Sequence, residues 1–279
     1  LTGGVSAEVT AIEIEQANGR VEKLVVRKHG PVDLAANPNV AADEFALLRV
    51  LHEEGLPVPA PRYVDATGEI FGTPCIVIDF VEGTTGFAPA TTGEAAEELA
   101  ELLARIHVID LARCDLSFLP QIRVRYAERL APPPTELDIE LDEGRIRETL
   151  AAAWPLSERN RPALLHGDFW PGNTLWVDGE LSGIIDWEDA AIGDPLADLA
   201  NSRMEMLLML GPEAMERFTA RYLSLTNLDL HDLPYWELGA TLRPITGMPN
   251  WELDAVELAS MRSRLKAFIA QAFEALGRR

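Results

Sequence analysis

The segment from Leu164 to Ala200 reads LLHGDFWPGNTLWVDGELSGIIDWEDAAIGDPLADLA, and it decides the fold. Within it, Asp168 is followed five residues later by Asn173, and Asp186 comes thirteen residues after Asn173. Two carboxylates and one amide at these spacings can assemble one phosphoryl-transfer centre. In such a centre one group orients an attacking hydroxyl, and the other two hold Mg²⁺ against a nucleotide.

Each of these three side chains suits its expected task. Asp168 follows an apolar strand in a predicted loop, where a carboxylate can accept a hydrogen bond from a hydroxyl and take its proton. Asn173 offers a neutral oxygen and Asp186 an anionic one, and Mg²⁺ prefers a few such oxygens together with phosphate and water. Taken singly, the three could be a turn residue, a cap and a strand-end carboxylate. The combination with Gly193-Asp194-Pro195 and Asp198 favours catalysis.

Composition bounds the class of protein. The chain has 279 residues, enough for one large domain or two lobes, and its formal net charge is −21. Such a charge argues against a nucleic-acid partner, because a phosphate backbone needs Lys and Arg to neutralise it. Cys75 and Cys114 form no metal-binding or disulfide pattern, which is typical of a reducing cytoplasm. No apolar run approaches a membrane span, so we expect a cytoplasmic chain without a membrane partner.

Periodicity predicts a small β-rich lobe followed by a larger helical lobe. Residues 1–85 are mostly strand-like, with one helix over 42–54 and a buried strand over 75–81. A β-hairpin is expected around the Asp178-Gly179 turn. Helices are predicted over residues 94–108, 145–153, 195–210, 212–225, 233–242 and 256–276. The fold class is therefore α+β, with a first domain at 1–83 and a second at 84–279.

Three motifs carry a family resemblance. The pattern His166-Gly-Asp168-x-x-x-x-Asn173 is followed by Ile185-Asp186-Trp187-Glu188 and by Gly193-Asp194-Pro195-x-x-Asp198-Leu199-Ala200. This series resembles the aminoglycoside phosphotransferase family, which belongs to the protein-kinase-like small-molecule kinases. The resemblance implies a bilobal kinase-like fold that uses ATP and Mg²⁺. It also implies that Asp168 is the catalytic base and that Asn173 and Asp186 are the metal ligands.

The same resemblance assigns parts of the first lobe to the nucleotide. Gly3 and Gly4 stand where the family places its phosphate-covering loop, although they do not form GxGxxG. Asp79, Phe80 and Val81 resemble the hinge strand whose backbone reads the adenine edge.

A charged pair is expected inside the first lobe. Glu44 shares a helical face with Leu48 and Leu51, and an acid that points toward a core needs a partner. The partner is Arg27 or Lys28, and strand alternation does not choose between them. The register of related sequences favours Arg27, whose guanidinium would clamp phosphates.

The resulting prediction is an ATP- and Mg²⁺-dependent phosphotransferase that acts on a hydroxyl of a small molecule. The acceptor is expected near Trp187, Glu188, Asp189 and Glu205. Acidic side chains there suit an amine-bearing or sugar-like acceptor such as an aminoglycoside, but the same residues could be solvated charges. The alternative is a non-catalytic nucleotide-binding or interaction module on a kinase scaffold. That alternative would require the loss of the base or of a metal ligand, and all three residues are present.

Overall fold

The computed structural model describes residues 7–85, 92–131, 134–251 and 253–278. The chain divides into two compact units, each described by itself below. The sheet unit comprises Leu1–Gly86, Ala112–Phe118 and Asn173–Glu188, and the helical unit comprises Phe87–Leu111, Leu119–Gly172 and Asp189–Arg279. The α+β class predicted from periodicity is confirmed.

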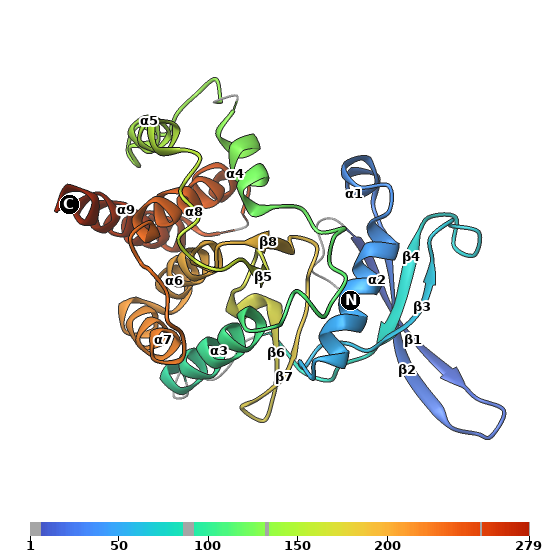
Figure 1. Ribbon diagram of the computed structural model, residues 1–279. Helices are drawn as coiled ribbons and strands as arrows, with labels where there is room; N and C mark the ends of the chain where they lie inside the picture. The colour runs from blue at the N-terminus through green and yellow to red at the C-terminus, as the bar shows by residue number, and fades with distance from the viewer. Residues whose placement is uncertain (1–6, 86–91, 132–133, 252, 279) are drawn as a thin grey trace. The chain divides into compact units, whose positions relative to one another are not determined.

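The core of the sheet unit is a four-stranded antiparallel sheet with the order β1-β2-β4-β3 (Figure 1). Its strands are β1 (Ala7–Glu15), β2 (Val21–His29), β3 (Pro61–Asp65) and β4 (Cys75–Asp79), and its helices are α1 (Pro31–Ala36) and α2 (Val40–Glu53). Helix α2 packs on β3 and β4 and buries Leu47, Leu48 and Leu51. The sequence did not predict β3, because Pro61 seemed to continue an extended connection. Pro61 is the first residue of the strand, a position at which the missing N–H is tolerated.

The hairpin of β6 (Thr174–Val177) and β7 (Glu180–Ile184) belongs to the sheet unit. Thr84 pairs with Trp176 as an isolated bridge, and Ile184 N donates to Pro57 O at 2.8 Å. These backbone bonds group the hairpin with the first lobe, whereas the predicted division placed it in the second domain. The turn at Asp178-Gly179 is where the sequence placed it.

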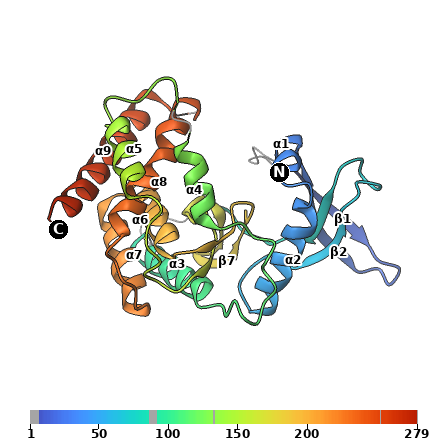
Figure 2. The ribbon, with the colours of Figure 1, turned by 45° about the horizontal axis from the view of Figure 1, so that its top comes forward.

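The helical unit is built from helices around a short antiparallel ribbon. Its helices are α3 (Thr92–His107), α4 (Ile122–Leu130), α5 (Glu143–Ala153), α6 (Leu196–Leu210), α7 (Pro212–Leu225), α8 (Leu233–Gly247) and α9 (Ala255–Gly277), and its ribbon pairs β5 (Ala163–Leu165) with β8 (Ala191–Gly193). Helices α3, α6 and α7 lie side by side in Figures 1 and 2. Helix α4 is an addition to the predicted set.

A buried ion pair ties three of these helices together. Arg203 on α6 donates to Glu237 on α8 at 2.8 Å and to the Thr219 hydroxyl on α7 at 2.6 Å. The two charged side chains are 9% and 5% exposed, so the pair fixes how α6, α7 and α8 meet more than it adds stability.

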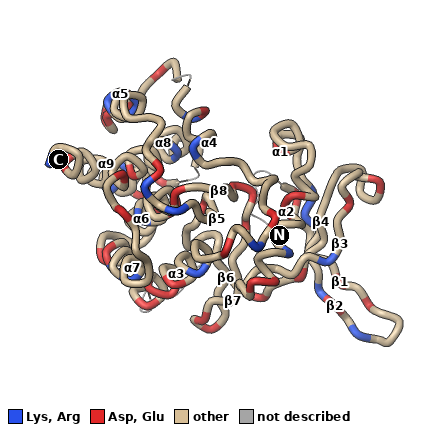
Figure 3. The backbone as a smooth tube through the Cα atoms, in the orientation of Figure 1, with Lys and Arg blue, Asp and Glu red and all other residues tan. Residues whose placement is uncertain are grey.

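Asp and Glu are distributed along both units, as Figure 3 shows, in keeping with the net charge of −21. Among the helices that the structure describes, none is both long enough and apolar enough to cross a bilayer.

Candidate active site

A buried carboxylate on α6 holds the loop that carries Asp168 in place. Asp198, 1% exposed on α6, accepts hydrogen bonds from His166 N at 2.7 Å and from Gly167 N at 2.9 Å. The ring of His107 lies 3.2 Å from the same carboxylate. His166 is itself fully buried, and its Nδ1 accepts from Asp168 N at 3.3 Å. The loop is therefore fixed by α6 before any ligand binds.

Gly167 makes this loop possible. Its φ is +81°, and a Cβ at this position would lie 1.9 Å from the carbonyl oxygen of Asp189. A residue with a side chain would therefore clash as well as adopt a strained backbone.

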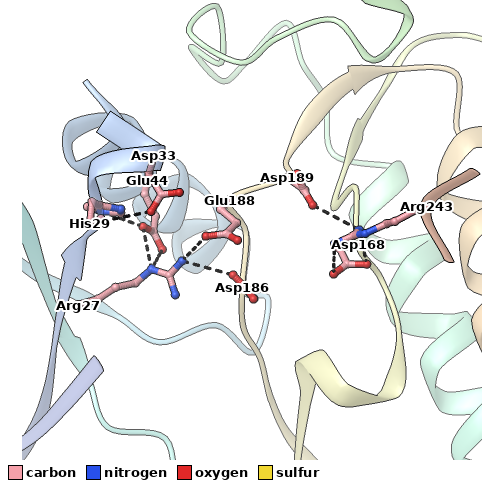
Figure 4. A network of polar contacts seen from close by, with 10 residues as sticks. Arg27, His29, Asp33, Glu44, Asp168, Asp186, Glu188, Asp189 and Arg243 are labelled. Atoms are coloured by element: carbon pink, nitrogen blue, oxygen red, sulfur yellow. Dashed lines mark hydrogen bonds and ion pairs between the residues drawn. The ribbon is translucent and has the colours of Figure 1, made fainter. Parts of the chain in front are cut away.

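Asp168 forms an ion pair with an arginine that the sequence analysis did not single out. Arg243 on α8 places Nη1 at 2.7 Å from Oδ1 and Nη2 at 3.1 Å from Oδ2 of Asp168, while Nη1 also lies 3.4 Å from Asp189 (Figure 4). The predicted helix covers residues 233–242. Helix α8 instead continues through Pro244 to Gly247 and presents Arg243 to the loop.

Glu205 on α6 is the other acidic group near Asp168. Burial, and after it the charge of Asp168, raise the pKa of Glu205 from 4.5 to about 7 against the opposing charge of Arg243. The sequence predicted Glu205 as a substrate contact, and that role stays a prediction.

In the sheet unit, Arg27 on β2 is surrounded by three carboxylates. Its Nε lies 3.2 Å from Glu44 on α2, and its Nη2 lies 2.8 Å from Glu188 and 3.4 Å from Asp186 (Figure 4). Burial alone would lower the pKa of Arg27, but the three carboxylates outweigh it and the pKa is raised. Burial likewise raises the pKa of Glu44, against the opposing effect of Arg27.

Of the two cations that the sequence left open, the structure pairs Arg27 with Glu44. Lys28 points elsewhere and lies 2.9 Å from the exposed Glu8. The predicted ion pair is therefore confirmed, while the role of Arg27 in phosphate binding stays a prediction.

The expected metal ligands are brought together by the β6–β7 hairpin. Ile185 N donates to Asn173 O at 2.9 Å, so Asp186 follows directly after the residue that pairs with Asn173. Asp186 has φ +66°, one of three positive values at non-glycine residues in the described ranges. Strained backbone of this kind is concentrated at functional sites.

An amide oxygen and a carboxylate oxygen are hard ligands that fit Mg²⁺. Within the described residues, no group of three or more His, Cys, Asp or Glu is arranged to hold a metal.

The remaining predicted residues have mixed placements. Gly3 and Gly4 lie outside the described residues. Asp79 N donates to Ala60 O at 2.9 Å and Phe80 N donates to Lys23 O at 3.3 Å, so these two N–H groups are used within the sheet unit. The role of Asp79, Phe80 and Val81 in binding adenine stays a prediction.

The expected acceptor face is less open than the sequence suggested. Trp187 is 2% exposed and therefore a core residue. Glu188 is bound to Arg27, and Asp189 is bound to Arg243 and lies 3.6 Å from Arg125. Two of the three carboxylates that were expected to attract an amine, Glu188 and Asp189, are thus already paired with arginines.

Comparison with solved structures defines the class of fold. The GDP complex of aminoglycoside 2'-phosphotransferase-IIIa superposes with a TM-score of 0.64 at 19% identity, covering 100% of this chain and 90% of that one. A macrolide 2'-phosphotransferase from Brachybacterium faecium superposes with a TM-score of 0.62 at 20% identity, covering 94% and 89%. The fold is that of the kinase-like phosphotransferases. The chain belongs to the phosphotransferase enzyme family, whose model matches residues 1–239.

Curated relatives are similar over shorter stretches. Acyl-CoA dehydrogenase family member 10 of Mus musculus is 27% identical over 202 residues, which cover 64% of this chain and 18% of that protein. Homoserine kinase of Allorhizobium ampelinum is 34% identical over 159 residues, which cover 51% and 46%. The matched part thus spans about a fifth of the first relative's length and about half of the second's.

Proposed function

We propose that this chain is an ATP- and Mg²⁺-dependent phosphotransferase that moves the γ-phosphate to a hydroxyl of a small molecule. The observation that carries the proposal is Asp168, a carboxylate on a loop that Asp198 holds in place. The same family member also has Asn173, and its Asp186 lies 3.4 Å from the partly buried Arg27. The non-catalytic module would require one of these groups to be missing.

The chain's own residues divide the work. Asp168 accepts the hydrogen bond of the acceptor hydroxyl and takes its proton as the new oxygen–phosphorus bond forms and the bond to ADP breaks. Arg27 neutralises phosphate charge, and Glu44 keeps the guanidinium in place. Bound Mg²⁺, for which Asn173 and Asp186 are the ligands, supplies further charge neutralisation on the phosphate oxygens.

Arg27 can bind phosphates only by releasing some of its present carboxylate contacts. Its Nη2 contacts both Glu188 and Asp186, whereas its Nε contacts Glu44. Phosphate oxygens would therefore replace the Nη2 partners and leave the Glu44 contact intact. Release of Asp186 from Arg27 would make its carboxylate available to the metal.

An amine-bearing or sugar-like acceptor, such as an aminoglycoside, is the finer form of the proposal. It is supported by solved relatives that are named for aminoglycosides and macrolides, while the homoserine kinases point to a metabolic acceptor. The ion pairs of Glu188 and Asp189 weaken the electrostatic argument for an amine.

The test is ADP release above the water-only rate with a panel of aminoglycosides, macrolides, sugars, hydroxylated amines and homoserine. Asp168→Asn should lower turnover by ~10²–10⁴-fold with nucleotide affinity nearly unchanged. Asp178→Asn is the matched control, because it removes the same charge from an exposed turn. Wild-type turnover in Asp168→Asn would show that the base lies elsewhere. Binding of Mg·ATP without acceptor-dependent ADP release would favour the non-catalytic module.

A further inference from the structure

A small cavity in the helical unit adjoins the loop of Asp168. The space in it that can hold a bound group is about 30 Å³, enough for a group of the size of a water molecule. The residues used in the argument are Arg125, Arg129, Gly167, Asp189, Asn201 and Arg243. They come from α4, α6, α8 and the loops next to β5 and β8, so the cavity is built from elements that are far apart in the sequence.

The cavity gathers three arginines in a strongly acidic chain. They line it together with two aspartates, Asp189 and Asp198. Asp198 is committed to the backbone N–H groups of His166 and Gly167. Arg125 pairs with Asp189 and Arg243 pairs with Asp168, so two of the three arginines already have a carboxylate partner.

Arg129 supplies the charge that is not neutralised. Its guanidinium lies 5.2 Å from the ring centre of Tyr126, and no described carboxylate lies within ion-pairing distance of it. Arg125 and Arg243, in contrast, both contact Asp189. The cavity can thus accept one negative charge without displacing an existing ion pair of Arg129.

A buried donor points to the same conclusion. Asn201 on α6 is 6% exposed, and within the described part of the chain its Nδ2 has no hydrogen-bond partner. A buried donor without a partner costs about 1–3 kcal/mol, so such groups in native proteins usually await a ligand or an ordered water.

We infer that this cavity binds a carboxylate of the acceptor, so that the acceptor is a hydroxy acid. The inference rests on the proposed function and names the substrate class of that same site. One uncompensated positive charge matches a monoanion, and planar guanidinium groups match the planar carboxylate. The Nδ2 of Asn201 would donate to the same group. Gly167 lines the cavity and precedes Asp168, so the hydroxyl and the carboxylate are separated by a short chain.

Arg243 connects carboxylate binding to the base. Its two terminal nitrogens now occupy both oxygens of Asp168. A carboxylate in the cavity competes for this guanidinium and frees an oxygen of Asp168 to accept the hydroxyl proton. A neutral or cationic acceptor offers no such competitor, so a hydroxy acid both binds and releases the base.

The experiment measures binding without nucleotide, by ligand-detected NMR titration. Lactate, β-hydroxybutyrate and γ-hydroxybutyrate are each compared with their own primary amides. At least one acid should bind about tenfold more tightly than its amide. Arg129→Gln should weaken the binding of that acid by about 3- to 10-fold and leave the binding of its amide unchanged. Arg123→Gln on the same helix is the matched control, because Arg123 pairs with the exposed Glu158 and lies outside the set of residues that line the cavity.

Two further variants separate binding from folding and from catalysis. Asn201→Leu should keep or raise the unfolding temperature of the free chain, since it removes a buried unpaired donor. The same variant should still weaken binding of the acid. Asp168→Asn should bind the acid more tightly, because Arg243 is released, although it is expected to lose phosphoryl transfer. Equal binding of acid and amide, or acid binding that survives both Arg129→Gln and Asn201→Leu, would overturn the inference. Neither result would affect the test of the proposed function, which measures ADP release.

Discussion

Removal of Arg27 should destabilise the sheet unit far more than removal of any other cation on β2. The side chains of Arg27 and Glu44 are 11% and 8% exposed, so Arg27→Met leaves a buried carboxylate without its counter-charge. Breaking a buried pair from one side costs about 3–5 kcal/mol. Glu44→Gln should cost only about 1 kcal/mol, because Arg27 keeps Glu188 and Asp186 as partners. The double variant should lose less than the sum, with a coupling of about 1–3 kcal/mol.

The pH dependence of the same variant is a sharper test. His29 lies 3.2 Å from Glu44, and burial followed by the charge of Arg27 lowers the pKa of His29 from 6.5 to about 4. A histidine with a lowered folded pKa binds fewer protons than it does in the unfolded chain. Stability of the native protein should therefore fall as the pH drops from 6.5 to about 4, by about 3 kcal/mol from this group.

In Arg27→Met the pH slope should be shallower. Loss of the guanidinium removes one of the two causes that lower the pKa of His29, while burial stays, so the folded pKa moves back toward 6.5. A smaller gap between the folded and unfolded pKa leaves less stability to lose on acidification. We therefore expect Arg27→Met to lose less stability than the native protein does as the pH drops from 6.5 to about 4.

The measurement is urea unfolding of the native protein and of each variant across this pH range. Lys28→Met is the control, because its partner Glu8 is exposed and such a pair contributes about 0–1 kcal/mol. If Arg27→Met costs no more than Lys28→Met, or if both have the pH slope of the native protein, the buried pair is not organised as described. A parallel titration with Mg·ATP shows whether the lost pair also weakens nucleotide binding.

Three other predictions concern single residues. Asp186→Gly should abolish Mg²⁺-dependent ATP binding in calorimetry without lowering the unfolding temperature, since glycine adopts the φ of +66° freely. In the folded chain the pKa of Glu205 is raised from 4.5 to about 7. The stabilisation linked to this shift is therefore present below pH 4.5 and is lost as the pH rises to 7. Glu205→Gln should remove this loss, which is at most about 3 kcal/mol, and an unchanged pH profile in urea unfolding would contradict the shift. Gly167→Ala should destabilise by more than about 2 kcal/mol, whereas Gly179→Ala should cost about 1 kcal/mol, because only the former meets a backbone oxygen.

Local features of the fold could be predicted from the sequence because short-range chemistry determines them. The Asp178-Gly179 turn fixes the β6–β7 hairpin, and the hairpin places Asp186 next to the partner of Asn173. The choice between Arg27 and Lys28 could not be made from alternation, since Leu24, Val25 and Val26 are all buried and the strand has no alternating pattern. Family register decided it correctly.

Long-range contacts could not be predicted from the sequence. Arg243 and Asp168 are 75 residues apart, and Arg243 lies on α8 just beyond the predicted end of that helix. A proline inside a helix removes one backbone hydrogen bond, yet α8 continues through Pro244 to Gly247. Packing of α8 against α6 and α9 outweighs that loss.

The charge of the candidate site is a second feature that the sequence alone could not predict. Counting residues gave −21 and an expected affinity for amines, yet Glu188 and Asp189 are each bound to arginine. An acidic surface is spread over the chain and is screened within about 10 Å at ordinary salt, whereas the guanidinium groups of Arg129 and Arg243 converge on one cavity. Substrate charge is therefore set by the few groups that lie next to the bound acceptor, and the proposed carboxylate site in this cavity would favour an acid over an amine.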